Sequence, residues 1–185
     1  MLLGLDISTS CTGYSLFDSE GHLIDIGYIR LDSKDNVFRR VSDVSNRISE
    51  ILSKREIDKV FIEENLQAFR PGLSSARTLL TLARFNGMVS YQIYSLTDRL
   101  PVYINVNTAR KILGIKINRK SDVSTKDQIY NWVANDLKTT NTLVSWPYKI
   151  LKSGPRKGLK ILDTAAYDMA DAYVIAKAGI QLETK

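Results

Sequence analysis

The stretch MLLGLD, residues 1–6, is an apolar run that ends in a carboxylate, as expected of a short buried strand whose last side chain emerges at its end. The stretch VFIEE, residues 60–64, repeats this pattern and ends in Glu63 and Glu64. Successive side chains of a strand point to opposite faces, so the two glutamates cannot both face one site. Asp168 and Asp171 lie three residues apart in an Ala-rich segment, where a helix would place them on one face.

Together these carboxylates predict a site for divalent cations. Carboxylates at the ends of two strands, with a pair on one helix face, can hold two Mg²⁺ or Mn²⁺ ions against a phosphodiester. The pair lies among small residues, so its helix can approach the sheet closely, and its two like charges then repel each other unless a cation compensates. Each group also has a structural alternative: Asp6 as a turn cap, Glu63 as a solvated strand end, and the pair as an exposed acidic face. Asp163 is expected to cap their helix.

The order of elements predicts an α/β fold. Strands expected at 2–7, 13–17 and 23–29 form an antiparallel meander, and a helix capped by Asp35 leads to a strand at 59–62 that should lie parallel to an earlier one. Further elements are expected as helices at 74–95, 108–113, 124–137 and 163–178, a strand at 101–106 and an irregular loop at 138–160. We expect a mixed five-stranded sheet with helices on both faces, in a single domain over residues 1–185.

Charge and composition favour an anionic polymer as partner. The net charge is +6 at pH 7, and residues 110–160 hold twelve Lys or Arg against three acids. This concentration is typical of a phosphate-backbone footprint, although a solvated basic surface has the same composition. No apolar run suggests a membrane span, and we expect no signal peptide. Cys11 is the only cysteine, which excludes an internal disulfide and a Cys-based zinc site and favours a reducing, intracellular compartment.

Six motifs resemble, in order, those of the RuvC-type Holliday-junction resolvases. The first motif resembles the family's opening strand and turn, the second resembles its second acidic motif, and the third resembles the Ala-Arg-Gly step of the next helix. The fourth and fifth motifs resemble the family's two basic segments, and the last resembles its closing acidic helix. The motifs are GLDISTSCTGY at 4–14, FIEEN at 61–65, ARFNG at 83–87, VNTARK at 106–111, STKDQI at 124–129 and DMADA at 168–172. They span nearly the whole chain.

The resemblance implies an RNase H-like fold and a homodimer that resolves four-way or other branched DNA by symmetric nicks through two-metal-ion hydrolysis, without a small-molecule cofactor. It implies that Asp6, Glu63, Asp168 and Asp171 bind two Mg²⁺ or Mn²⁺ ions. Lys126 is the implied catalytic cation near the scissile phosphate. The apolar helix around Leu79, Leu80, Leu82, Ala83 and Phe85 is the candidate dimer interface. With the charge pattern, the resemblance gives these candidate DNA contacts: Phe69, Arg70, Arg77, Arg110, Lys111, Lys116, Arg119, Lys120, Lys152, Arg156 and Lys157.

Departures from the family leave alternatives open. Segment 139–162 resembles an insertion, and small divergent members of this kind are common in phages, which suggests a phage-encoded protein in the cytoplasm of a bacterial host. An RNase H-like nuclease for RNA–DNA hybrid or RNA would share the fold and the metal chemistry. A non-catalytic nucleic-acid binding module would share the charge. An actin-like ATPase or sugar kinase would need glycine where Ser8 stands and two lobes that 185 residues cannot supply.

Overall fold

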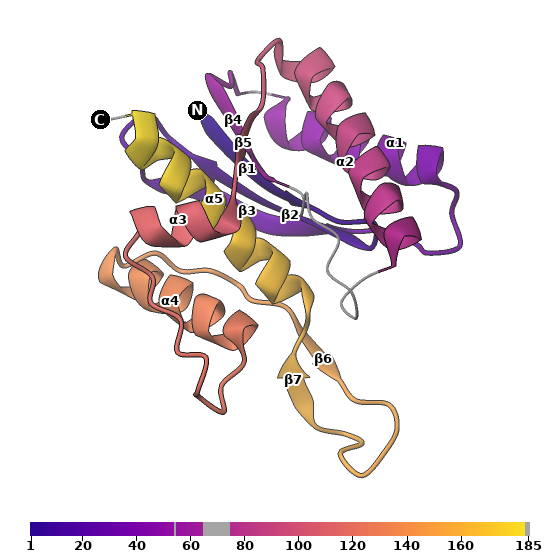
Figure 1. Ribbon diagram of the computed structural model, residues 1–185, viewed down its shortest axis with the longest axis vertical. Helices are drawn as coiled ribbons and strands as arrows, with labels where there is room; N and C mark the ends of the chain where they lie inside the picture. The colour runs from indigo at the N-terminus through magenta and orange to yellow at the C-terminus, as the bar shows by residue number, and fades with distance from the viewer. Residues whose placement is uncertain (54, 65–74, 184–185) are drawn as a thin grey trace.

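The computed structural model describes residues 1–185 except 54, 65–74 and 184–185. Within this part of the chain a five-stranded sheet lies at the centre, with strand order β3-β2-β1-β4-β5 (Figure 1). Its strands are β1 (Leu2–Ile7), β2 (Cys11–Phe17), β3 (Leu23–Arg30), β4 (Lys59–Glu63) and β5 (Val102–Ile104). The first three form an antiparallel meander, and β4 and β5 run parallel to β1. The predicted mixed sheet is confirmed.

Helices cover both faces of this sheet, as predicted (Figure 1). The helices are α1 (Val37–Leu52), α2 (Ala76–Thr97), α3 (Val106–Ile112), α4 (Thr125–Thr139) and α5 (Ala165–Glu183). One core lies between the sheet and α1 with α2, and the other lies between the sheet and α5, with α3 and α4 packed outside. Strand β4 shows the alternation, because Val60 and Ile62 belong to the first core and Phe61 to the second.

Helix α5 lies unusually close to the sheet, as its small residues predicted. A Cβ atom built on Gly4 would lie 2.6 Å from the carbonyl oxygen of Ala172, and one on Gly13 would lie 1.9 Å from that of Asp168. The Ser15 hydroxyl donates a hydrogen bond of 2.9 Å to the Ala172 carbonyl. Only glycine leaves room for such close backbone approach, so these positions fix the height of α5 above β1 and β2.

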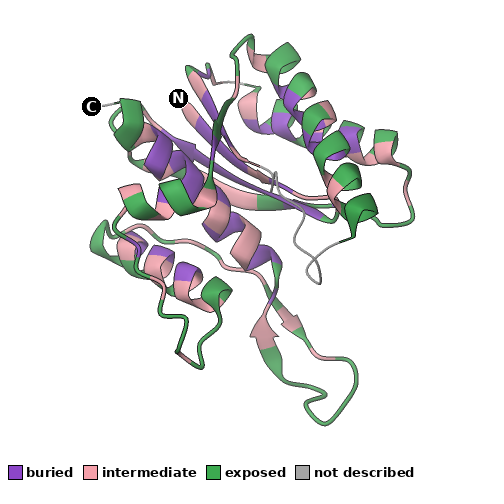
Figure 2. Ribbon diagram, in the orientation of Figure 1, coloured by how far each residue is buried: buried purple, intermediate pink, exposed green. Residues whose placement is uncertain are grey.

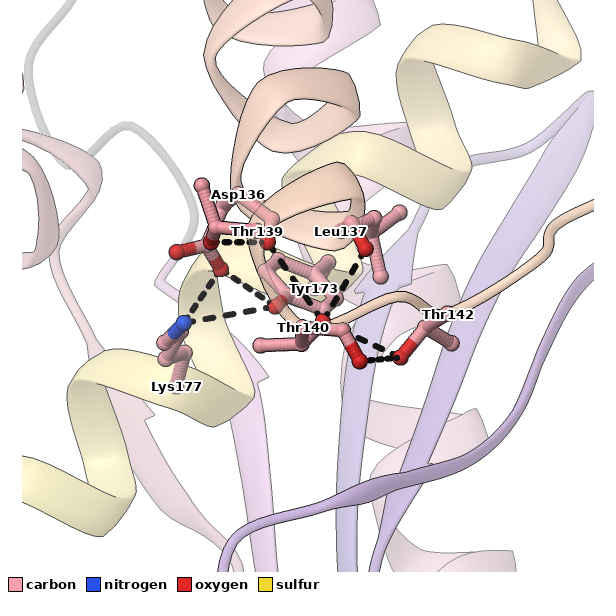
Figure 3. A network of polar contacts seen from close by, with 7 residues as sticks. All are labelled: Asp136, Leu137, Thr139, Thr140, Thr142, Tyr173 and Lys177. Carbon is pink, nitrogen blue, oxygen red and sulfur yellow. Dashed lines mark hydrogen bonds and ion pairs between the residues drawn. The ribbon is translucent and has the colours of Figure 1, made fainter.

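A polar network fastens the end of α4 to α5 (Figure 3). The Asp136 carboxylate accepts a hydrogen bond of 2.5 Å from the Tyr173 hydroxyl and pairs with the Lys177 ammonium. The Thr139 hydroxyl donates 2.7 Å to the Asp136 carbonyl and closes the last turn of α4. Because Tyr173 and Lys177 belong to α5, the network sets the position of α4 relative to the helix that carries the acidic pair.

The expected irregular loop over residues 138–160 is wrong in part, because a paired hairpin interrupts it. Strands β6 (Tyr148–Ile150) and β7 (Lys160–Leu162) pair antiparallel to form a hairpin. At its tip Gly154 and Gly158 have φ of 80° and 88°, and the Gly158 N–H donates 2.8 Å to the Leu151 carbonyl. The glycines that suggested irregularity are therefore the residues that let the chain turn.

Helix starts agree with the prediction at one position and differ at another. Helix α1 is capped by Asn36, whose side chain accepts 3.0 Å from the Arg39 N–H, so the predicted cap at Asp35 is wrong. The cap predicted at Asp163 is confirmed, because its carboxylate accepts 3.0 Å from the Ala165 N–H. Across the described residues, no helix has the length and apolar character needed to cross a membrane.

Candidate active site

Three carboxylates meet at the edge of the sheet where β1 and β4 end. Asp6, Glu63 and Asp171 each offer an oxygen, and these atoms all lie within 4.8 Å of one another. Asp6 and Glu63 meet there because β1 and β4 are parallel neighbours, so their carboxyl ends share one edge. Asp171 reaches the same point from α5, which the close approach at the glycines holds down on the sheet. Oxygen donors in this number and spacing suit a hard divalent cation.

The fourth predicted carboxylate lies beside this triad. Asp168, one turn earlier on α5, lines the same cavity of about 670 Å³ as Asp6, Glu63 and Asp171. Its carboxylate is not among the oxygens that meet within 4.8 Å. Glu64 does not line the cavity, and its side chain accepts a hydrogen bond of 3.3 Å from the Asn105 amide. The structure therefore gathers the four carboxylates expected from the resemblance and leaves Glu64 outside.

Burial, with repulsion between like charges, raises the pKa of every carboxyl group that lines the cavity. Burial and the neighbouring Glu63 and Asp171 charges raise the pKa of Asp6 well above its ordinary value. Burial, and then the Asp171 charge, raise the pKa of Glu63 to about 7, and burial raises the pKa of Asp171 to about 6. Burial also raises the pKa of Asp168. Carboxylates this close repel each other, so a bound cation would remove the repulsion.

Two of the predicted cations line the same cavity as these carboxylates. Lys126, in the first turn of α4, and Arg110, in α3, line the cavity, and their charges act to lower the pKa of Glu63 and Asp171. The Lys126 ammonium lies 5.7 Å from the centre of the Tyr167 ring. A cation at a helix start is unfavourable to the helix dipole, so its placement beside an acidic cavity fits a role toward an anionic substrate.

The cavity also contains residues that the sequence reasoning missed. Arg30, at the end of β3, lines it and donates a hydrogen bond of 2.6 Å to Asp163, the cap of α5. Cys11 lines it too, and a hydrogen bond from its thiol acts to lower the pKa of Asp168. The strand pairing of the meander could have identified Arg30, because this residue lies opposite Cys11 across β2 and β3. Cys11 itself lies on β2, the strand next to the one that carries Asp6.

The candidate DNA contacts fall into separate groups. Arg110, Lys111, Lys116 and Arg119 line a second cavity of about 520 Å³, and Arg110 lies in the wall that this cavity shares with the acidic one. Lys120 is exposed in the loop between α3 and α4, and Arg77 is exposed in the first turn of α2. The exposed loop of the β6–β7 hairpin carries the remaining three described candidates, Lys152, Arg156 and Lys157. The candidates Phe69 and Arg70 lie outside the described residues.

A mixed sheet of this order, with clustered carboxylates where parallel strands end, defines a nuclease of the RNase H-like class. A family profile described as crossover junction endodeoxyribonuclease RuvC matches residues 2–139. The chain therefore belongs to the RuvC family of crossover junction endodeoxyribonucleases, as the motifs indicated. A search of curated protein sequences finds no match.

Solved structures of Holliday junction resolvases have the same fold. The Thermus thermophilus RuvC in complex with Holliday junction substrate is 15% identical, with a TM-score of 0.64, and the match covers 99% of this chain and 94% of that one. A second Thermus thermophilus RuvC structure is 16% identical, with a TM-score of 0.59 and coverage of 99% and 95%. The yeast mitochondrial Holliday junction resolvase Ydc2 is 11% identical, with a TM-score of 0.54 and coverage of 99% and 80%. At these identities the likeness is one of fold.

Proposed function

We propose that this chain is a metal-dependent endonuclease that resolves four-way DNA junctions by hydrolysing a phosphodiester in each of two strands. The observation that carries the proposal is the meeting of Asp6, Glu63 and Asp171 within 4.8 Å in a cavity that Lys126 and Arg110 also line. Family membership and the basic charge of the chain support the same substrate. We expect the chain to act as a single domain over residues 1–185, inside the cell that holds its DNA substrate, with a phage-infected bacterium as the expected source.

The residues present fit a metal centre. Asp6, Glu63 and Asp171 supply hard oxygen ligands with raised pKa values, and Asp168 lines the same cavity and would supply a ligand to a second ion. We propose two Mg²⁺ or Mn²⁺ ions per site. When bound, such ions lower the pKa of a water nucleophile and neutralise the leaving oxygen. The remaining work falls to this chain's own cations: Lys126 and Arg110 attract the phosphodiester and hold its charge beside the carboxylates.

We further propose a homodimer, because a four-way junction has approximate two-fold symmetry and its resolution needs two cuts. One face of α2 offers an uncovered apolar surface, with Leu80 72% and Tyr91 65% exposed. Phe85, expected at the interface, is 0% exposed and belongs to the core, so that part of the expected interface is wrong. The interface would instead use the outer side of α2, and light scattering at micromolar concentration tests it: Leu80→Asp should yield monomer and uncoordinated nicks.

A nicking assay separates this function from the alternatives. The substrates are a synthetic four-way junction, a fork, a linear duplex and an RNA–DNA hybrid, each with Mg²⁺ or Mn²⁺ and with chelator. We expect paired nicks in the junction that need the metal. Asp6→Asn should abolish cleavage and leave DNA binding intact or tighter, because repulsion between the cavity and phosphate falls.

Other outcomes assign a different function. Cleavage of the hybrid but not of the junction would identify an RNase H-like nuclease for RNA–DNA hybrid. Tight binding without cleavage under either metal would identify a non-catalytic nucleic-acid binding module. Equal cleavage of the linear duplex and the junction would remove the structure selectivity from the proposal.

A further inference from the structure

The β6–β7 hairpin has features that the acidic cavity does not explain. It lies beyond residue 139, where the match to the family profile ends. Figure 2 shows its loop exposed over most of its length and extending away from the sheet and helices. On the strands, Tyr148 is 52% and Ile150 64% exposed. A two-stranded hairpin is at best marginally stable by itself in water, so an uncovered ribbon of this kind suits a surface that a partner covers.

The charge of the hairpin indicates what kind of partner fits. Residues 148–162 contain no acidic residue and these five cations: Lys149, Lys152, Arg156, Lys157 and Lys160. Among the described residues none of the five has a carboxylate within ion-pairing distance. The Lys160 ammonium instead lies 4.8 Å from the centre of the Tyr148 ring. Cations without ion pairs on a narrow ribbon complement the charge of a nucleic-acid backbone, and a two-stranded ribbon fits a DNA groove.

The base of the hairpin is fixed to the active site. The Asp163 N–H donates 2.9 Å to the Pro147 carbonyl and so continues the ladder of β6 and β7. The carboxylate of the same residue caps α5 and binds Arg30, which lines the acidic cavity. The hairpin therefore leaves the protein only a few residues before Asp168, from a point that is held by hydrogen bonds on two sides.

The reach of the hairpin follows from its length. Five residue steps separate Leu162 from Lys157, and because residues 155–158 form a turn, the tip lies at most about 17 Å from the base at roughly 3.3 Å per residue. Duplex DNA rises about 3.4 Å per base pair, so the hairpin can span up to about five base pairs from its base to its tip. A duplex that leaves the acidic cavity along the hairpin would meet Lys152, Arg156 and Lys157 at that distance.

We propose that the β6–β7 hairpin binds the sugar–phosphate backbone of one duplex arm of the DNA, about five base pairs from the phosphodiester held at the carboxylates. The inference rests on the proposed function, because it needs a branched DNA substrate at that site. It adds a second point of attachment, which fixes the direction in which one arm leaves the enzyme.

The test combines a protein variant with a chemical change in the DNA. The hairpin variant is Lys152→Gln, Arg156→Gln and Lys157→Gln together. The matched control neutralises three exposed cations around α1, on the other face of the sheet: Lys34→Gln, Arg39→Gln and Arg47→Gln. After the wild-type nick has been mapped, the probe is a four-way junction with uncharged methylphosphonate linkages three to seven nucleotides from that nick. Binding is measured without divalent metal, so that the DNA stays intact.

We expect the hairpin variant to bind the unmodified junction at least tenfold more weakly. Its salt slope should be lower by about two to three, because each phosphate that is no longer neutralised removes roughly 0.9 from the slope. At limiting DNA its nicking rate should fall together with its affinity, because fewer junctions are bound. Wild type and control should lose affinity when the linkages are neutralised, and the hairpin variant should not. Equal melting temperatures establish that the variant is folded.

Two results would contradict the inference, and they are distinguishable. If the wild type nicks junctions while the hairpin variant keeps wild-type affinity and salt slope, the hairpin does not touch DNA and the proposed function stands. If the wild type binds no branched DNA at all, the proposed function fails, and the hairpin assignment fails with it.

Discussion

Gly13 and Asp168 meet backbone to backbone: a Cβ atom on Gly13 would lie 1.9 Å from the Asp168 carbonyl oxygen. Gly13 is also the cross-strand partner of Asp6 in the β1–β2 ladder. The missing side chain therefore lets α5 settle beside the strand that carries the first carboxylate. Together with Gly4, this position sets the distance between the carboxylates of sheet and helix.

Gly13→Ala should disturb both stability and activity. The obstacle is backbone, which cannot rotate away, so α5 must move, and overpacking of this kind costs about 1–3 kcal/mol or more. We expect a lower free energy of unfolding in urea and a loss of nicking of about 10²-fold, as for a 1 Å misplacement of catalytic groups. Chemical denaturation and single-turnover nicking of the junction measure the two effects.

Gly27→Ala is the matched control for this change. A Cβ atom there would lie 2.6 Å from the Tyr14 hydroxyl and 2.7 Å from its ring, which are side-chain rather than backbone atoms, and Gly27 does not line the acidic cavity. We expect a smaller loss of stability than for Gly13→Ala and a nicking rate near wild type. Equal losses of rate in the two variants would show that the close approach at Gly13 does not position Asp168.

Tyr167→Phe should slow nicking through Lys126. The Tyr167 hydroxyl donates 2.6 Å to Asp127, the residue after Lys126, while its ring lies 5.7 Å from the Lys126 ammonium. Loss of the hydroxyl frees the first turn of α4, which carries Lys126. We expect a nicking rate roughly tenfold lower, a smaller loss than the 10²-fold that a 1 Å misplacement can cause. Affinity for the junction should change little, because no charge is removed.

A comparison with the other end of α4 shows whether this effect is specific. Tyr173→Phe removes a hydrogen bond of the same chemistry to Asp136, where the helix ends, away from Lys126. We expect its main effect on stability: the free energy of unfolding should fall by about 1.5–3 kcal/mol, as for a hydrogen bond to a charged group. The nicking rate should fall less than in Tyr167→Phe. Combining Tyr167→Phe with Lys126→Ala should add no further loss of rate. Additive losses would mean that Tyr167 does not act through Lys126.

The sequence predicts the sheet and its carboxylates because their signals are local. Apolar runs that end in an acid define β1 and β4, and the rule that a crossover helix joins parallel strands brings Asp6 and Glu63 to one edge. The spacing of Asp168 and Asp171 places them on one side of α5. Small residues predict the close approach of that helix, and Gly4 and Gly13 are where the approach occurs.

Interactions set by register and by long-range packing are outside the reach of that reasoning. Arg30 ends an ordinary strand, and only its place opposite Cys11 brings it to the cavity. Tyr167 has no local pattern that indicates a bond to Asp127, forty residues away. Glycine and proline, as found near residues 154–158, are expected both in an irregular loop and in the turn of a hairpin. Only the cross-strand pairing of β6 with β7 decides between the two.

Glu63→Gln and Glu64→Gln should differ sharply although the residues are neighbours. Glu63 lies with the triad, whereas Glu64 is turned away and bonded to Asn105. Loss of a group that only supports a metal ligand weakens metal binding roughly 10–100-fold. Loss of the ligand Glu63 itself should weaken Mn²⁺ binding by at least that much. Calorimetry with Mn²⁺ and the junction assay should show large losses for Glu63→Gln and near-normal values for Glu64→Gln. Similar losses would overturn the assigned register of β4 at its end.

Without metal the protein should be less stable in mild alkali than in mild acid. The pKa of Glu63 is raised to about 7 and that of Asp171 to about 6. At a pH between the ordinary carboxyl pKa and these raised values, the native state therefore binds more protons than the unfolded chain. Stability then falls as pH rises from about 4 to about 7, because each carboxyl group must ionise beside the others. A loss of 1 kcal/mol lowers the melting temperature of a chain of this size by about 2–4 °C.

Added metal should reverse this trend, since a cation neutralises the ionised carboxylates. Melting of the protein in chelator should occur several degrees lower at pH 8 than at pH 5.5, and Mg²⁺ or Mn²⁺ should raise the melting temperature far more at pH 8. Asp6→Asn should flatten the pH dependence and reduce the metal effect, while Glu64→Gln should leave both unchanged. A metal-free protein that becomes more stable between pH 5.5 and pH 8 would show that these carboxylates are not crowded as the cavity places them.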